Sequence, residues 1–228
     1  MRPCCGQHDG RLTSSGCPGT AATLYPVEDA HLVERLASRE EILKGKFLQV
    51  RRDTVYLPDA RLATREYVVH PGAVMVIPLL QAEAGAPLRV VMERQFRYPI
   101  GHVITEFPAG KLDPGEDLWV CAQRELREET GYRAAEWAHA GRMHPLVAYS
   151  TEFIDIWFAR GLTAGDRALD EGELLDVITA SPAEILQWCR DGTITDGKTL
   201  AGTLWLQNLL SGTWSLDWKT TTKRAAAG

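Results

Sequence analysis

The pattern of hydrophobic residues along the chain predicts short strands interleaved with helices. Runs rich in aliphatic, aromatic and β-branched residues, the composition of strands, fall at 46–57, 65–69, 72–80, 88–95, 103–107, 153–159 and 174–179. We expect the first of these runs to fold as a strand pair. Strands alternating with helices predict an α/β or α+β fold in which a mixed sheet lies between helices.

Three segments carry the signals of helices. The segment 117–130 follows a Pro-Gly turn and stops at Gly131, a residue type suited to the left-handed position after a helix. Pro182 at a first helical position predicts a helix over 182–190, and an amphipathic pattern predicts another over 198–210.

These signals divide the chain into four parts. Residues 1–23 are rich in Gly, Ser, Thr and Cys and have no hydrophobic period, so we expect a flexible leader there. Residues 24–71 are expected to form an N-terminal β element, 72–212 the main domain, and 213–228 a C-terminal tail.

Composition and charge remove several classes of protein. The 228 residues include 25 Lys and Arg against 30 Asp and Glu, a net charge of −5, so we expect no nucleic-acid partner. No apolar run approaches the roughly 20 residues that cross a membrane, and no secretory signal is visible. The 5 cysteines have neither a disulfide framework nor zinc-ligand spacing, so a cytoplasmic location is expected.

The predicted helix 117–130 carries several carboxylates, and their phases can be worked out at about 100° per residue. With Glu125 as the origin, Glu129 lies near 40° and Ala122 near 60°, whereas Glu128 lies near −60°. Glu125 and Glu129 therefore project from within the apolar stripe. The alternative is a solvated, charge-rich helix, which such compositions usually form.

Carboxylates on the packed face of a helix repel one another and need a cation. Oxygen ligands without His or Cys select hard ions such as Mg²⁺ or Mn²⁺, which often share their coordination with substrate phosphates. Arg124 lies four residues before Glu128 and is placed to hold that carboxylate. The pattern indicates a metal site that handles phosphates.

The same stretch resembles the Nudix box, G-x5-E-x7-R-E-U-x-E-E-x-G-U, in which U is a bulky apolar residue. Gly110, Glu116 and the run 124–132 (RELREETGY) match each fixed position, and Tyr132 stands where an aliphatic residue is usual. The resemblance implies the Nudix fold and hydrolysis of a nucleoside diphosphate linked to another moiety.

The flanking sequence is similar to the ADP-ribose and ADP-sugar pyrophosphatase branch of that family. The segments 93–101 (ERQFRYPIG) and 106–113 (EFPAGKLD) resemble the branch's pattern, and Pro145 follows the box as in that branch. Tyr149 departs from it, because the branch has a glycine there, and this weakens the substrate assignment.

The resemblance implies a role for each box residue. Glu125 and Glu129 would coordinate Mg²⁺, or Mn²⁺, together with the backbone carbonyl of Ala109. Glu128 would complete the ligand set and Glu116 would support it. Two or three such ions would bridge the pyrophosphate of the substrate.

Residues outside the box receive roles from the same resemblance. Arg97 would contact a substrate phosphate, a contact that suits the guanidinium, and Glu106 belongs to the same substrate-binding stretch. Arg65 and Glu66 would reach the nucleotide, in the same subunit or in the partner of a homodimer. The N-terminal β element would serve that dimer, by exchange across a two-fold axis.

A base must take a proton from the attacking water. The resemblance assigns that role to Glu173 in the acidic loop 170–173, with Glu171 as the alternative; without the family context, this loop would be an ordinary solvated turn. The predicted function is Mg²⁺-dependent hydrolysis of ADP-ribose to AMP and ribose 5-phosphate. The alternatives are another nucleotide sugar such as GDP-mannose, or a non-catalytic nucleotide sensor.

Overall fold

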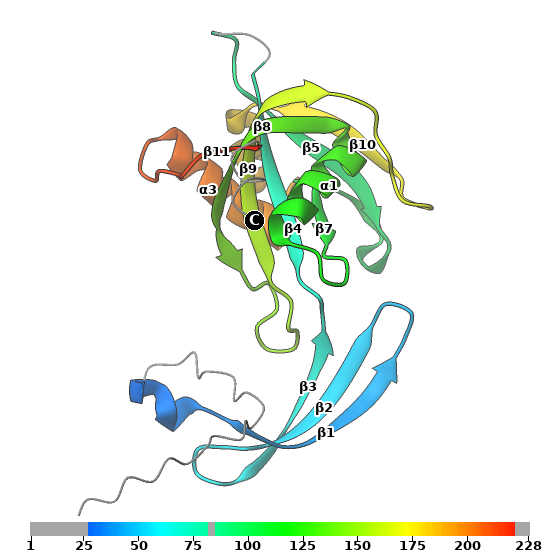
Figure 1. The fold of residues 1–228 in the computed structure, drawn as a ribbon, viewed down its shortest axis with the longest axis vertical. Coiled ribbons are helices and arrows are strands. Elements are labelled where there is room, and N and C mark those ends of the chain that lie inside the picture. The colour runs from blue at the N-terminus through cyan, green and yellow to red at the C-terminus, as the bar shows by residue number, and fades with distance from the viewer. Residues whose placement is uncertain (1–26, 82–84, 222–228) are drawn as a thin grey trace, which may run out of the picture.

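A computed structural model describes residues 27–81 and 85–221, which form two β-sheets and three α-helices (Figure 1). The expected leader, residues 1–23, lies outside the described residues, as do residues 222–228 of the expected tail. None of the described helices is long and apolar enough to cross a membrane.

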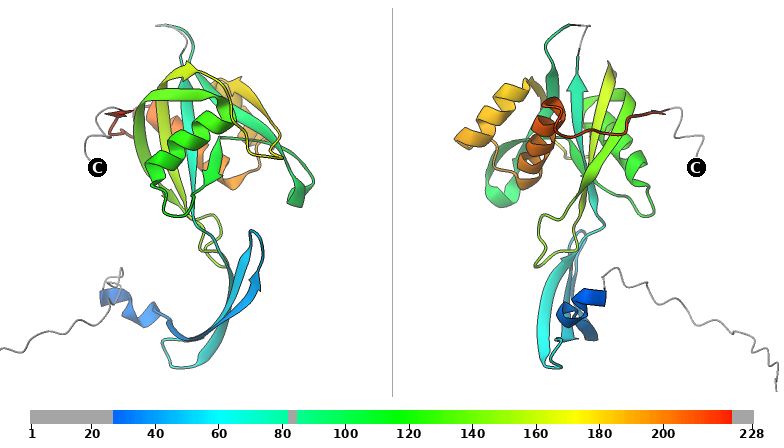
Figure 2. Two further views of the ribbon diagram at one scale, coloured as in Figure 1. Left: turned by 45° about the vertical axis from the view of Figure 1, so that its right-hand side comes forward. Right: turned by 90° about the vertical axis from the view of Figure 1, so that its left-hand side faces the viewer.

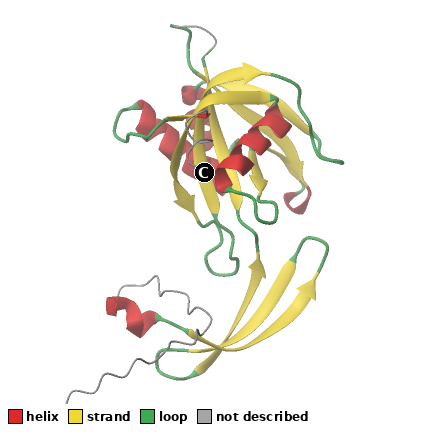
Figure 3. Cartoon of the chain, in the orientation of Figure 1, coloured by secondary structure: helices red, strands yellow, loops and turns green. Residues whose placement is uncertain are grey.

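The N-terminal sheet is a three-stranded antiparallel unit that extends away from the main body (Figures 1 and 3). A short 3-10 helix, η1 (Val27–Leu32), precedes its strands, and their order is β1-β2-β3. The strands are β1 (Arg35–Lys44), β2 (Gln49–Tyr56) and β3 (Leu62–Val69). Every residue of β1 is exposed. This sheet therefore has little core of its own.

The main sheet has the order β10-β5-β4-β9-β8-β11, with β6 paired to β5 and β7 to β4. Among the described strands of this sheet, only β4 and β9 pair in parallel, so the sheet is mixed as expected. Its strands are β4 (Ala73–Leu80), β5 (Arg89–Arg97), β6 (His102–Glu106), β7 (Ala109–Lys111), β8 (Tyr132–Met143), β9 (Ile154–Ala164), β10 (Leu175–Ala180) and β11 (Lys219–Thr220). The 3-10 turn η2 (Tyr98–Ile100) joins β5 to β6.

Helices cover both faces of this sheet (Figure 2). Helix α1 (Leu118–Thr130) packs on one face, and α2 (Pro182–Asp191) and α3 (Gly197–Leu210) pack on the other. Alternation along β4 sends Val74 and Val76 toward α1, and Met75 and Ile77 toward the other two helices. Burial on both faces explains why this strand is a continuous apolar run.

The helix ends follow from local sequence. Asp117 caps α1, because its carboxylate accepts hydrogen bonds from the amides of Trp119 and Val120 at 2.9 and 3.3 Å. Gly131 ends the helix with a φ of 77°, a conformation that glycine adopts without strain. Pro182 is at the first turn of α2, behind a capping box formed by Ser181 and Glu184. All three predicted helices are confirmed.

Several strand predictions need correction. The segment 46–57 is not a strand pair: it contains the single strand β2, whose partner β1 lies before it and was not predicted. Strands β7 and β8 and the two-residue strand β11 were also missed. In β8 a bulge between His139 and Gly141 interrupts the alternation of buried and exposed residues, which removes the usual signal of a strand.

Candidate active site

Helix α1 and strand β7 place the carboxylates of the box on the floor of a pocket. The backbone of Gly110 in β7 lies directly against Glu125, and a Cβ atom at this position would be 1.9 Å from the carboxyl carbon. Only glycine allows this approach. The glycine that opens the box is thus explained by packing rather than by a turn.

Glu125 and Glu129 are buried, as their helical phase predicted. They are 9% and 3% exposed. Burial raises the pKa of Glu125 to about 7. Burial, followed by repulsion from Glu93, Glu125 and Glu173, raises the pKa of Glu129 to about 10. One oxygen of Glu129 accepts a hydrogen bond from the amide of Ala109 at 3.0 Å. The amide of Ala109 thus holds the side chain of Glu129 in place.

Arg124 organises the remaining box acids. Its guanidinium donates to both oxygens of Glu116 at 2.8 Å, to Glu125 at 2.8 Å and to Glu128 at 3.2 Å. A further bond, of 3.1 Å, runs to the carbonyl of Lys111. These contacts confirm the predicted pairing with Glu128. Hydrogen bonding to Arg124 is the main reason why the pKa of Glu116 falls to about 2.

The pocket beside these acids has a volume of about 430 Å³. Glu125, Glu128 and Glu129 are among the residues that line it. Among the described residues, no three Asp, Glu, His or Cys side chains are already gathered as metal ligands. Arg124 instead takes up part of the charge of Glu125 and Glu128.

Two cationic side chains at this pocket share one buried carboxylate. Arg97, at the end of β5, and Lys198, in the first turn of α3, both line the pocket. Both contact Glu106, which is 1% exposed: Arg97 Nε donates to Oε1 at 2.8 Å, and Lys198 Nζ contacts Oε2. The prediction had placed Arg97 and Glu106 at the substrate but had not found Lys198.

A second buried carboxylate adjoins Glu106. Glu93 on β5 is its partner in the β5–β6 register and is fully buried, and neither of its oxygens has a hydrogen-bond partner. Burial, then repulsion from Glu106, raises its pKa to about 8. Burial thus favours the neutral form of Glu93, which avoids the cost of an unpaired buried charge.

Of the two candidate bases, the structure brings Glu173 to the pocket. Glu173 lines it together with Asp170, and its carboxylate accepts a bond from the amide of Asp170 at 3.3 Å. Glu171 is exposed and does not line the pocket. The loop thus turns one of its two glutamates inward.

Arg65 and Glu66 lie elsewhere in the chain. Both are on β3, where Arg65 pairs with Glu34 and Glu66 accepts a bond from Arg52 at 2.7 Å. Neither lines the pocket of its own chain. A contact with nucleotide would have to be made in a partner subunit.

Other pocket residues were not found by sequence reasoning. The turn between β1 and β2 places Phe47 at the pocket, where its ring contacts His70 and lies 4.2 Å from Lys111 Nζ. Glu152, 4.0 Å from His70, also lines it. None of these residues belongs to a local pattern that marks a site.

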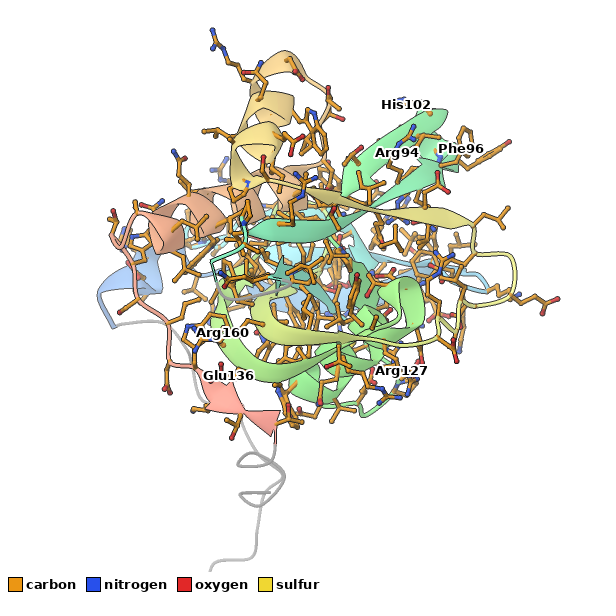
Figure 4. The ribbon with its side chains drawn as sticks, turned by 90° about the horizontal axis from the view of Figure 1, so that it is seen from above. Arg94, Phe96, His102, Arg127, Glu136 and Arg160 are labelled. Atoms are coloured by element: carbon orange, nitrogen blue, oxygen red, sulfur yellow. The ribbon has the colours of Figure 1, made fainter. Side chains whose placement is uncertain are left out.

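Other exposed groups lie apart from the pocket. In Figure 4, Arg160 and Glu136 lie side by side, 2.7 Å apart, on the paired strands β8 and β9. Phe96 and His102 stand on the β5–β6 hairpin, and Phe96 is 53% exposed. None of these four residues lines the pocket.

Comparison with known proteins identifies the family. The NUDIX domain matches residues 69–201, and the chain belongs to this family as a Nudix hydrolase. A methanol dehydrogenase activator from Bacillus methanolicus is 38% identical over 178 residues, which cover 76% of this chain and 92% of that protein. An ADP-ribose pyrophosphatase from Bacillus subtilis (strain 168) is 33% identical, over 77% of this chain and 94% of that protein.

A solved structure, described as an ADP compounds hydrolase, has the same fold. Its TM-score is 0.69 at 19% identity, and the match covers 79% of this chain and 95% of that one. The predicted family, the mixed sheet between helices and the hydrolase class are confirmed.

Proposed function

We propose that this chain hydrolyses ADP-ribose to AMP and ribose 5-phosphate with the help of Mg²⁺. One observation carries the proposal: two buried carboxyl groups with raised pKa values, Glu125 and Glu129, line a pocket that Arg97 also lines. Such a pocket suits a pyrophosphate that is bridged to the acids by cations and bound directly by an arginine.

The acids on the pocket floor fit a hard divalent cation. Glu125, Glu129 and Glu128 offer carboxylate oxygens, and their mutual repulsion gives a reason for a cation to bind among them. The carbonyl of Ala109 is a further oxygen ligand in this proposal. When bound, Mg²⁺ would neutralise charge on the pyrophosphate and lower the pKa of a water molecule. Arg124 then orients Glu125 and Glu128, and Glu116 holds Arg124.

Glu173 is the proposed general base. It is supported by its place at the pocket, within electrostatic reach of Glu125 and Glu129. A carboxylate on a loop is able to approach the water when substrate is bound. Glu171 remains the alternative base, and it would have to turn inward.

The substrate class rests on the relatives. Proteins from Bacillus subtilis and Mycobacterium tuberculosis named ADP-ribose pyrophosphatase are 33% and 31% identical to this chain. The decisive experiment measures phosphate-coupled turnover of ADP-ribose beside GDP-mannose, ADP-glucose and NADH, with Mg²⁺ and with excess EDTA. Metal-dependent release of AMP chiefly from ADP-ribose is expected. Turnover of GDP-mannose alone would make GDP-mannose the substrate in place of ADP-ribose. Tight binding of ADP-ribose, with no turnover of any of the four compounds, would refute the enzymatic proposal.

We also propose a homodimer built on the N-terminal sheet. Strand β1 is exposed along its whole length, including Leu36 at 53% and Ile42 at 41%. Such a sheet gains stability by packing against a second chain, which would bring Arg65 and Glu66 to the partner's pocket. Light scattering should give twice the mass of the chain, and Leu36→Lys with Ile42→Lys should give a monomer. A monomeric wild-type protein would contradict the proposal.

A further inference from the structure

One buried carboxylate holds two cations at the pocket wall. Glu106 offers one oxygen to Arg97 and the other to Lys198, and it is itself 1% exposed. Asp196, which caps α3, holds Lys198 from its other side at 2.9 Å. Lys198 keeps only 12% of its side chain exposed. A lysine held this firmly loses little further rotamer freedom when it binds a ligand.

Anchoring the start of α3 does not require Lys198. Its neighbour Thr199, which is fully buried, already ties α3 to the segment after β6, because Thr199 Oγ1 accepts a bond from the amide of Phe107 at 3.2 Å. Thr199 also donates to Asp196, at 2.7 Å. The helix start is therefore fixed without the charge of Lys198, whose side chain faces the pocket instead.

The donors that remain are suited to phosphate. Lys198 uses two directions of its ammonium group, for Glu106 and Asp196, and an ammonium has three N–H donors. Arg97 contacts Glu106 through Nε, which leaves the Nη side of the guanidinium for a ligand. The same pocket is lined by these two cations and by the carboxylates of Glu125, Glu128 and Glu129. A diphosphate bridged to the acids by metal ions would have its other oxygens available to Lys198 and Arg97.

We propose that Lys198 binds a phosphoryl oxygen of the substrate's diphosphate beside Arg97, and that Glu106 positions both cations. This inference rests on the proposed function, because it assigns a contact within the same site. Lys198 and Arg97 touch the substrate, whereas Glu106 acts through them. The charge that Lys198 supplies is thus used in recognition as well as in neutralising Glu106.

A double-mutant cycle separates the two roles of Lys198. We would measure the affinity for ADP by calorimetry in Ca²⁺ for the wild type, Lys198→Met, Glu106→Gln and the double variant. Methionine keeps the apolar stem of lysine and removes the charge. Lys219, on β11, pairs with exposed Asp217, so Lys219→Met is the matched control. Circular dichroism checks that each variant is folded.

The proposal expects Lys198→Met to weaken ADP binding by about tenfold or more, both in the wild type and in the Glu106→Gln background. The control should bind as the wild type does. If Lys198 acted only by neutralising Glu106, its loss would have no effect once Glu106 is Gln, and this outcome would overturn the proposal. Lys198→Met leaves Glu106 without one of its two cations, and this single variant could fail to fold. In that case the comparison of the double variant with Glu106→Gln alone still decides the question.

The test is separate from that of the proposed function, because ADP binding does not require ADP-ribose to be the substrate. If the wild type binds ADP but does not hydrolyse ADP-ribose, the proposed function is refuted, and the double-mutant cycle can still be measured with ADP. Normal hydrolysis with an unchanged ADP affinity in Lys198→Met refutes the phosphate contact alone.

Discussion

The acids of the pocket should destabilise the metal-free protein, and Glu129→Gln should remove part of that cost. In the folded protein Glu129 has a pKa of about 10, against an ordinary value of 4.5. At pH 7 it is therefore protonated when folded and ionised when unfolded. Keeping Glu129 protonated in the folded protein lowers the free energy of unfolding by about 1.4 kcal/mol for each pH unit above 4.5, which is about 3 kcal/mol at pH 7. The result is the same for any folded pKa well above 7.

Glutamine has no charge to lose and keeps an oxygen that accepts the bond from the amide of Ala109. We therefore expect metal-free Glu129→Gln to be more stable than the wild type by up to about 3 kcal/mol at pH 7. For a chain of this size that corresponds to a rise in Tm of roughly 6–12 °C.

The pH dependence gives the sign of the effect. A carboxyl group whose folded pKa is raised binds its proton more tightly when folded, so stability is highest below about pH 4.5 and falls as the pH rises toward the folded pKa. The advantage of Glu129→Gln should thus be under about 1 kcal/mol at pH 5 and largest at pH 8. Asp217→Asn, at a side chain that is 82% exposed, is the control and should change nothing.

Thermal and urea unfolding in EDTA at pH 5 and pH 8 test this reasoning. An equal Tm for Glu129→Gln and the wild type at pH 8 would refute the buried-charge argument. A gain that is the same at both pH values would show a packing effect instead of proton linkage. Added Mg²⁺ should stabilise the wild type more than the variant, because the proposed ligand is lost.

Three further outcomes are expected. Arg124→Met frees the carboxylates that Arg124 holds and should lower kcat by about two orders of magnitude, as measured with ADP-ribose. Glu173→Gln should lower kcat by roughly 100-fold or more with unchanged Mn²⁺ affinity, and a larger loss in Glu171→Gln would move the base. Mn²⁺ affinity, followed by calorimetry, should rise from pH 6 to pH 8, since burial raises the pKa of Glu125 to about 7 and the ion binds the charged form; a flat profile would contradict this.

The parts of the fold that were predictable are those with local signals. Helix α1 has a capping aspartate, an apolar stripe and a terminal glycine within one short segment, and the phase of Glu125 and Glu129 followed from that stripe. Strand β4 is apolar throughout because both of its faces are covered.

Strand β1 gave no such signal, and the reason is physical. Its residues (RLASREEILK) are all exposed in the described chain, so no face of the strand had to be apolar. It is a strand because it pairs with β2 along its length, and its own hydrophobic pattern does not indicate that pairing. A hydrophobic pattern reflects burial, and no residue of β1 is buried.

The acids and the cations of the pocket differ in how the sequence encodes them. Glu125, Glu128 and Glu129 all lie on helix α1, so one motif contains them and reveals their chemistry. The cations are brought there by tertiary structure: Lys198 meets Glu106 across 92 positions of sequence, through the docking of α3 on the segment after β6. A local motif therefore predicts the acids, while the side chains proposed to bind the diphosphate are placed by the packing of distant elements. Affinity for the diphosphate should accordingly respond to changes on β5, β6 and α3 that leave the box untouched.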